Sequence, residues 1–286
     1  MRVLAPAKVN LFLRIVGRRA DGYHLLDSLM VPVSLFDEIT VEASRGRLEI
    51  VVTCDDPSLP DDETNLAHRA AALLCKETGV QAKISIDLCK RIPAGAGLGG
   101  GSSDAAAVLK SLNVLLSLGL TADRLGTLGA RLGADVPFFI PCRPARVAGI
   151  GEVLTEVPPL PSCWLVIVVP PFGVSTPWAY RRFDELPSPE LPPANVASQW
   201  FSDRWPSPEL LVNDLERAVL PAYPQIGGIK DHLLRLGAEG ALMSGSGSAV
   251  FAVFQSRTVA EHAVTALTGA EKTFLVEPLT GPPTTV

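Results

Sequence analysis

Apolar residues recur at every second position near the N-terminus, from Val9 to Ile15. A period of two residues is typical of a strand, because successive side chains point to opposite faces. Lys8 and Asn10 therefore share the face opposite the apolar row. The pattern predicts an N-terminal strand that presents two polar side chains side by side.

Apolar periodicity, continuous apolar runs and turn residues predict further elements along the rest of the chain. Strands are expected over residues 38–43, 48–53, 83–88, 164–169, 249–254 and 273–278, with turns at Asp21-Gly22 and Arg45-Gly46. Helices are expected over residues 65–78, 102–112, 122–132, 210–219, 226–236 and 261–267. Asn65 is the expected cap of the first helix, and Gly79 is its expected stop. This mixture predicts an α+β enzyme of two lobes, the second beginning near residue 150.

Composition narrows the class of protein. The chain has 286 residues, of which 47% are hydrophobic, so it can bury a full core without disulfides or metal ions. Its net charge of −5 and the lack of a basic tract argue against nucleic-acid binding. The longest apolar run stops at Pro170, short of the roughly 20 residues of a membrane span, and Lys8 interrupts any signal-peptide core. We expect a cytoplasmic monomer or weak dimer with no membrane partner.

Cysteines and histidines show no spacing that is typical of metal or disulfide sites. The five cysteines are odd in number and form no C-x-x-C pair, so reduced thiols that are mostly buried are expected. The four histidines also lack metal-site spacing, which argues against a structural zinc ion. A Pro-rich stretch over residues 186–208 contains PSPEL, which recurs at residues 206–210, but nothing else indicates a repeat architecture.

Residues 95–103, GAGLGGGSS, form a glycine loop directly before a predicted helix. Free N–H groups and the positive end of a helix attract anions, and missing Cβ atoms let a phosphate approach the backbone. The alternative is a flexible turn. Asp104 is expected to face away from bound phosphates, and a bulky side chain at Gly99 or Gly100 is expected to block the approach of a phosphate with little loss of fold.

Two familiar nucleotide motifs fit this loop poorly. The P-loop motif requires a lysine after the glycines, and none is present. Gly95, Gly97 and Gly100 match G-x-G-x-x-G, but a dinucleotide fold also needs a second strand with an acidic end about 20 residues later. Residues 117–135 have the pattern of loop and helix instead.

A third motif matches more closely. PAGAGLGGGSSDAA (93–106) resembles the phosphate loop of the GHMP kinases, a superfamily of small-molecule kinases. Further segments resemble the branch that phosphorylates the 2-hydroxyl of a cytidine diphosphate-linked methylerythritol, in the methylerythritol phosphate route to isoprenoids. They are PAKVNLFLRIVGRRADGYHLLDSL (6–29), LGADVPFF (132–139), GVSTPWAY (173–180) and MSGSGSAVF (243–251). A homoserine- or mevalonate-type kinase and an inactive nucleotide-binding homologue are the alternatives.

The resemblance covers nearly the whole chain and implies a two-lobed GHMP kinase fold. Residues 1–150 would form a ribosomal-protein-S5-like ATP-binding lobe, and residues 151–286 a ferredoxin-like α/β sandwich lobe. The active site would lie in the cleft between the two lobes. The match is weakest in the Pro-rich stretch and in the C-terminal tail.

The resemblance also implies the catalytic residues. Asp135, in LGADVP, would accept the proton of the substrate hydroxyl, although the residues alone favour a helix cap followed by Pro137. Lys8 would lie beside it, keep it ionised and offset charge on the transferring group. An exposed charge at a strand end is the alternative for Lys8.

Binding residues follow from the same resemblance. Tyr23 and Tyr180 would stack on the cytosine, His24 would read its polar edge, and Asn10 would contact the polyol or phosphate part. Residues 245–248 would form a second loop that closes the cleft.

Magnesium is expected with ATP, but no carboxylate is marked as its ligand, and only Ser102 or Ser103 offers an oxygen. The full ATP set is Asn65, Leu66, Lys90, Pro93, Gly95, Gly97, Leu98, Gly99, Gly100, Gly101, Ser102 and Ser103, and the full substrate set is Asn10, Tyr23, His24, Asp135, Thr176 and Tyr180.

Overall fold

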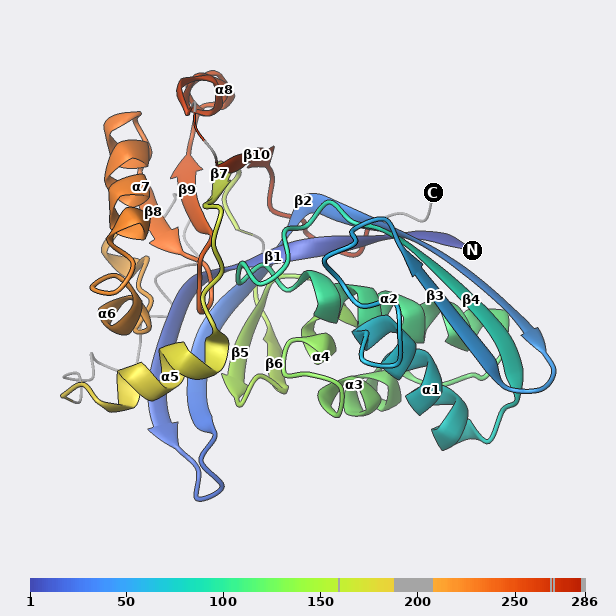
Figure 1. The fold of residues 1–286 in the computed structure, drawn as a ribbon. Coiled ribbons are helices and arrows are strands. Elements are labelled where there is room, and N and C mark those ends of the chain that lie inside the picture. Colours follow the sequence, from blue (N-terminus) through green and yellow to red (C-terminus); the bar gives the residue numbers. More distant parts are fainter. Residues whose placement is uncertain (159, 188–207, 268, 270, 284–286) are drawn as a thin grey trace.

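A long antiparallel hairpin of β1 (Arg2–Arg18) and β2 (His24–Arg45) runs through the molecule and contacts both lobes (Figure 1). The computed structural model describes residues 1–158, 160–187, 208–267, 269 and 271–283. Most of the Pro-rich stretch therefore lies outside the described residues. The predicted N-terminal strand is confirmed, and it is longer at both ends than its alternating core.

The N-terminal lobe contains a six-stranded sheet in the order β3-β4-β2-β5-β6, with β1 paired to β2. Its other strands are β3 (Glu49–Cys54), β4 (Ala82–Cys89), β5 (Ala145–Gly149) and β6 (Val153–Glu156). The turn at Arg45-Gly46 leads into β3, but β3 pairs in parallel with β4 rather than with β2. Four helices, α1 (Leu66–Thr78), α2 (Gly100–Leu115), α3 (Ala122–Ala130) and α4 (Val136–Phe139), cover one face of this sheet (Figure 1).

The C-terminal lobe contains a four-stranded antiparallel sheet in the order β10-β7-β9-β8. Its chain order of strand, helix, strand, strand, helix, strand is that of a ferredoxin-like fold, as expected. The strands are β7 (Trp164–Val169), β8 (Gly240–Met243), β9 (Val250–Phe254) and β10 (Lys272–Val276). The helices are α5 (Thr176–Asp184), η2 (Pro208–Leu210), α6 (Glu216–Val219), α7 (Pro224–Arg235) and α8 (Arg257–Ala266).

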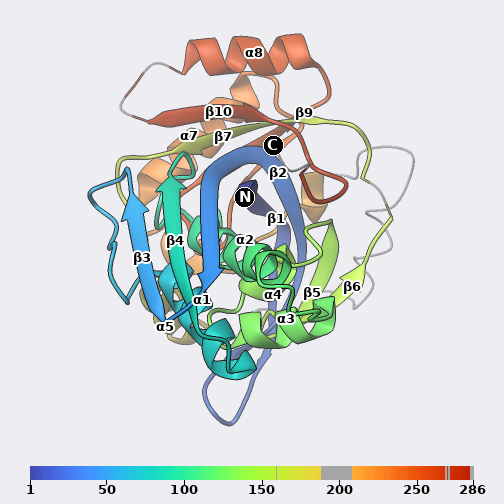
Figure 2. The ribbon, with the colours of Figure 1, turned by 90° about the vertical axis from the view of Figure 1, so that its right-hand side faces the viewer.

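The inner faces of the two sheets share one hydrophobic cluster. Val9 and Leu11 of β1 pack in the same cluster as Ile167 of β7 and Phe251 of β9, and all four are almost fully buried. Helices therefore lie outside and sheets inside, and Figure 2 shows α8 at one end of this stack and α3 towards the other. This arrangement fixes the position of β1 between the lobes.

Local signals predicted some elements correctly and one wrongly. Asn65 caps α1 by accepting the N–H of Ala67 at 2.8 Å, and Gly79 ends it at a φ of +69°. The helix predicted over 210–219 is wrong, because only η2 and α6 are helical there. The backbone between them pairs with β1 instead: Leu13 donates to Val212 at 2.8 Å.

Two further observations concern the cysteines and membrane crossing. All five cysteines are free, and three of them are buried, as predicted. Within the part of the chain that the structure describes, no helix combines the length and the apolar character that a membrane crossing needs.

Candidate active site

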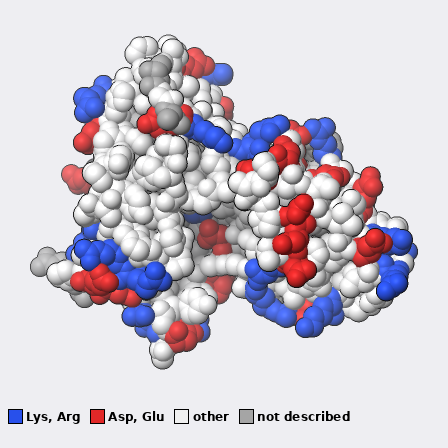
Figure 3. Space-filling model, in the orientation of Figure 1, with Lys and Arg blue, Asp and Glu red and all other residues white. Residues whose placement is uncertain are grey.

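A cleft of about 980 Å³ opens between the lobes, and Figure 3 shows the surface hollowed there. Its lining comes from the β1–β2 hairpin, the glycine loop, the turn before α4, the start of α5 and the second glycine loop. The structure brings all of the predicted site residues to this cleft except Ser103. Ser103 is buried, and its Oγ has no hydrogen-bond partner among the described residues.

Lys8 and Asp135 face each other at the floor of the cleft. The Lys8 Nζ lies 3.7 Å from Asp135 Oδ2 and donates to Asn10 Oδ1 at 2.6 Å. Asn10 in turn donates to Ser28 Oγ at 2.8 Å, and Ser28 donates to the backbone oxygen of Phe12. Asn10 therefore orients the lysine, because both ends of its amide are already engaged. Ser28 was missed by the sequence analysis, since a serine within a strand carries no distinctive pattern.

Burial controls the electrostatics of this pair. The Lys8 side chain is only 5% exposed, and burial lowers its pKa, an effect that the charge of Asp135 partly offsets. The Asp135 side chain is 37% exposed and makes no capping bond to α4, although it stands at the N-cap position. The helix-cap alternative for Asp135 is therefore wrong. Its carboxylate is open to the cleft.

The first glycine loop is anchored from both lobes. Lys8 N donates to the Leu98 carbonyl at 2.9 Å, and Ser244 Oγ donates to the Gly97 carbonyl at 3.0 Å. Gly97 has a φ of +77°, and a Cβ added there would lie 2.1 Å from the Ser244 carbonyl oxygen. Only glycine fits this position, because the two loops touch through their backbones.

The helix that follows the loop begins without a side-chain cap. Gly99 is the N-cap residue of α2, at a φ of +75°, and no side chain accepts the first N–H groups of the helix. This absence holds for the described residues, and N–H groups without a capping side chain attract an anion. The expectation that a bulky group would spare the fold is wrong at Gly99, because φ is +75° there and a Cβ would meet Phe139 at 3.0 Å. At Gly100 a Cβ would lie 3.0 Å from Ile92, so the expectation for this position stays a prediction.

Aromatic and charged groups line the opposite end of the cleft. The rings of His24 and Tyr180 stack with centroids 4.8 Å apart, and His24 Nε2 lies 2.7 Å from Asp184 Oδ1. Burial, together with the charge of Asp135, raises the pKa of Tyr180 above its ordinary value. Tyr23 is 61% exposed. Tyr180 thus packs on the histidine. No sequence pattern marked Asp184, which lies on the last turn of α5.

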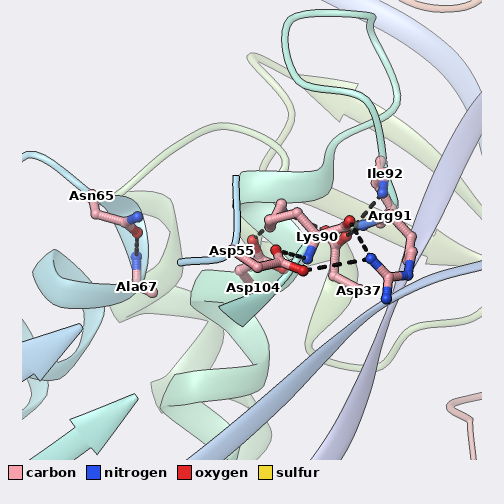
Figure 4. Close-up of polar contacts among 8 residues, drawn as sticks. All are labelled: Asp37, Asp55, Asn65, Ala67, Lys90, Arg91, Ile92 and Asp104. Carbon is pink, nitrogen blue, oxygen red and sulfur yellow. Dashed lines mark hydrogen bonds and ion pairs between the residues drawn. The ribbon is translucent and has the colours of Figure 1, made fainter. Parts of the chain in front are cut away.

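Two residues of the predicted ATP set are already engaged within the protein. Asn65 caps α1 through its oxygen and donates to the Pro60 carbonyl at 2.6 Å. The Lys90 ammonium is buried in ion pairs with Asp37 and Asp104 (Figure 4). Asp104, expected to face away from phosphates, directs Oδ2 to Lys90 at 2.5 Å. An ATP contact by the side chains of Asn65 and Lys90 stays a prediction.

The second glycine loop is held by side chains from the C-terminal lobe. Asn213 donates to the carbonyl oxygens of Met243 and Gly245 at 2.8 and 2.7 Å. Thr176 Oγ1, a predicted substrate contact at the start of α5, lies 2.7 Å from Ser246 Oγ. These contacts tie the loop to α5 and to the segment before α6, so its backbone is fixed at the edge of the cleft.

Known proteins match the chain across this whole architecture. Family models match at residues 65–142 (GHMP kinases N terminal domain) and 203–272 (GHMP kinases C terminal). The chain is 46% identical over 274 residues to a 4-diphosphocytidyl-2-C-methyl-D-erythritol kinase of Citrifermentans bemidjiense, covering 96% of each chain. The chain belongs to the 4-diphosphocytidyl-2-C-methyl-D-erythritol kinases.

Further comparisons agree with membership of the 4-diphosphocytidyl-2-C-methyl-D-erythritol kinases. A relative with the same description from Syntrophotalea carbinolica is 47% identical, covering 96% of this chain and 98% of the other. A solved structure of a 4-(cytidine 5'-diphospho)-2C-methyl-D-erythritol kinase superimposes with a TM-score of 0.82 at 37% identity, covering 99% of this chain and all of that one. The family resemblance and the GHMP kinase fold predicted from the sequence are therefore confirmed.

Proposed function

We propose that this enzyme transfers the γ-phosphate of ATP to the 2-hydroxyl of 4-diphosphocytidyl-2-C-methyl-D-erythritol, giving the 2-phosphate and ADP. This is a phosphotransfer to an alcohol group in the methylerythritol phosphate pathway to isoprenoid precursors. The observation that carries the proposal is the Lys8–Asp135 pair, which lies in one cleft with an uncapped helix start and an aromatic pocket.

The phosphates of ATP are placed on the loop and first helical turn over residues 97–102. Two features support this placement: the uncapped N–H groups of α2 and the positive end of the helix dipole. The Ser103 side chain is not among the proposed phosphate contacts, because it is buried away from the cleft.

The chemical step follows from the charges at the cleft floor. Asp135 accepts the proton of the 2-hydroxyl, the hydroxyl oxygen forms a bond to the γ-phosphorus, and the bond from that phosphorus to the β–γ bridging oxygen breaks. ADP leaves with the electron pair of that bond. Lys8 stabilises the negative charge that spreads over the transferring group, and Asn10 holds its ammonium in place.

Magnesium is expected with ATP, and the described residues hold no cluster of three or more acidic, histidine or cysteine side chains that could bind it. Magnesium takes few protein ligands and is shared between carboxylates, hydroxyls, waters and substrate phosphates. The Ser102 hydroxyl, which lines the cleft, would supply one oxygen. The ion would supply charge neutralisation on the phosphates.

The cytidine base is placed at the pocket of Tyr23, His24 and Tyr180. His24 would read a polar edge of the base, because a ring nitrogen remains beyond the one that contacts Asp184. A monomer or weak dimer is the proposed active form. The use of ATP and the five free thiols support a cytoplasmic location.

The test is a substrate panel with ATP and Mg²⁺: the cytidine substrate, its uridine analogue, homoserine and mevalonate. We expect turnover of the cytidine substrate, with the uridine analogue poorer by roughly 10⁴-fold in kcat/KM, because a site built to hydrogen-bond one group rejects a substrate that lacks it. Equal turnover of the uridine analogue would contradict the base pocket. Faster turnover of homoserine or mevalonate would assign the enzyme to another branch of the GHMP kinases.

A further inference from the structure

Beneath the glycine loop lies a group of three charged side chains that the transfer step does not use. The side chains of Asp37, Lys90 and Asp104 are exposed by 0%, 5% and 4%. The Lys90 ammonium forms ion pairs with both carboxylates, and Figure 4 shows it lying between them. The lysine therefore bridges β2 and α2.

Carboxylates also hold the backbone that leads into the loop. The ladder between β2 and β4 ends at residue 89. Beyond that point Asp55 accepts the N–H of Lys90 at 2.7 Å, and Asp37 Oδ1 accepts the N–H groups of Arg91 and Ile92 at 2.6 and 2.9 Å. Three successive N–H groups are thus fixed by side chains where the sheet no longer fixes them (Figure 4).

Two of these three residues, Lys90 and Asp104, lie near the two ends of the phosphate loop. Lys90 precedes Pro93, where the loop begins, by three residues, and Asp104 lies in the first turns of α2, where the loop ends. A Cβ on Gly100 would lie 3.0 Å from Ile92 and 3.4 Å from Asp37 Oδ2. The space between the two ends is therefore filled by the ion pairs and their immediate neighbours.

The charges indicate a role other than stability. Burying ions costs desolvation free energy, and a buried ion pair often adds no net stability over apolar residues. Two carboxylates on one ammonium also leave Asp104 Oδ1 without a partner among the described residues. Burial raises the pKa of Asp104 to about 7, although Lys90 opposes this, so the arrangement is costly at neutral pH. What it provides is a fixed distance between the segments that it joins.

We propose that Asp37, Lys90 and Asp104 form a loop clamp, a set of positioning residues that holds the two ends of the phosphate loop at the spacing that receives ATP. This inference rests on the proposed function, because that function places the ATP phosphates on residues 97–102. The clamp acts through the loop and does not touch the second substrate. Its loss therefore weakens ATP binding selectively.

The experiment compares two substitutions at one position. Asp104→Asn keeps an oxygen that accepts from Lys90, whereas Asp104→Ala releases the lysine from α2. We expect Asp104→Ala and Lys90→Met to raise the Kd of ATP by about tenfold, which corresponds to about 1.4 kcal/mol. Asp104→Asn should restore ATP affinity to near the unsubstituted value. Lys83→Met is the matched control, because Lys83 lies on β4 in an exposed ion pair with Glu49.

The readouts are ATP titration calorimetry without the second substrate, KM for each substrate, kcat and Tm. A rise in Kd and KM for ATP alone, with rescue by Asp104→Asn, supports the clamp. Unchanged ATP affinity in folded Asp104→Ala, or equal weakening of both substrates in step with a lower Tm, overturns it. Failure of the proposed function is distinguishable, because the unsubstituted enzyme would then bind ATP without phosphorylating the cytidine substrate.

Discussion

The ammonium of Lys8 is almost completely buried, and its surroundings explain how it keeps its charge. Asn10 supplies an oxygen at 2.6 Å and Asp135 a carboxylate at 3.7 Å, while Ser28 fixes the amide of Asn10. Each of these groups is oriented by another, so the amine cannot swing away from the cleft floor. A charge held in a water-poor site acts more strongly on a transferring phosphoryl group than the same charge in solvent.

Replacement of Asp135 tests its proposed role as the proton acceptor. Asp135→Asn keeps the shape but removes the base, so kcat should fall by roughly 10²–10⁴-fold. Dissociation constants of both substrates should change far less, because the carboxylate acts mainly in the transition state. Lys8→Met should also lower kcat, and the double variant should lose much less than the product of the single effects. Near-normal kcat in Asp135→Asn would remove the carboxylate from the mechanism.

The alkaline side of the pH profile reports on Lys8. Burial lowers the pKa of Lys8, so its charge is lost on raising the pH at a value below the ordinary 10.5. We expect kcat to fall along that alkaline limb. In Asp135→Asn the residual activity should fall at still lower pH, because the carboxylate no longer raises the lysine pKa. An alkaline limb at the same pH in both enzymes, measured from kcat between pH 7 and 10.5, would contradict this coupling.

Local signals identified some elements and not others. The cap Asn65 and the stop Gly79 sufficed for α1, alternation sufficed for β4, and continuous apolar runs marked β7 and β9, whereas α5 and β8 were not predicted. The segment before α6 failed because its backbone bonds go to β1, more than 190 residues away. Likewise Ser28, Asp184 and Asp37 came to the site through tertiary contacts, which no local pattern encodes.

The first turn of α2 offers a substitution that tests the phosphate loop while keeping the fold. Gly101 has ordinary helical geometry, and a Cβ there would touch only Leu66, at 3.4 Å. Gly101→Val should leave Tm unchanged or slightly higher, because valine costs a helix less than glycine. It should raise the Kd of ATP by about tenfold or more, or about 1.4 kcal/mol, by occupying the cleft side of the loop. Unaltered ATP affinity by calorimetry would place the phosphates elsewhere.

The two lobes are joined by a common hydrophobic core rather than by a linker. Val9 and Val31 of the hairpin share a buried cluster with Leu165 and Phe251 of the second sheet. The domain division at residues 150/151 stays a prediction, and β6 of the first sheet begins at Val153. If the lobes separated, each would expose its part of this cluster to water, and the hydrophobic stabilisation of that part would be lost.

Thermal unfolding tests this common core. We expect a single calorimetric transition, with the van't Hoff enthalpy equal to the measured enthalpy, because the core that joins the lobes cannot melt in only one of them. Residues 1–158 expressed alone should be insoluble or should lack a cooperative transition. Two resolved transitions in the intact enzyme, or a stably folded 1–158 fragment, would show instead that the lobes are independent.

The backbone contact between Gly97 and Ser244 has a consequence for recombination among related kinases. Ala249 donates its N–H to the Ala96 carbonyl, and Ser244 donates to Gly97, so the loops of the two halves are shaped against each other atom by atom. A hybrid that takes its first half from one parent and its second half from another brings together loops from different pairs. A single crossover between residues 97 and 244 should therefore lower activity more than a crossover outside this interval, as kcat compared across a set of hybrids would show.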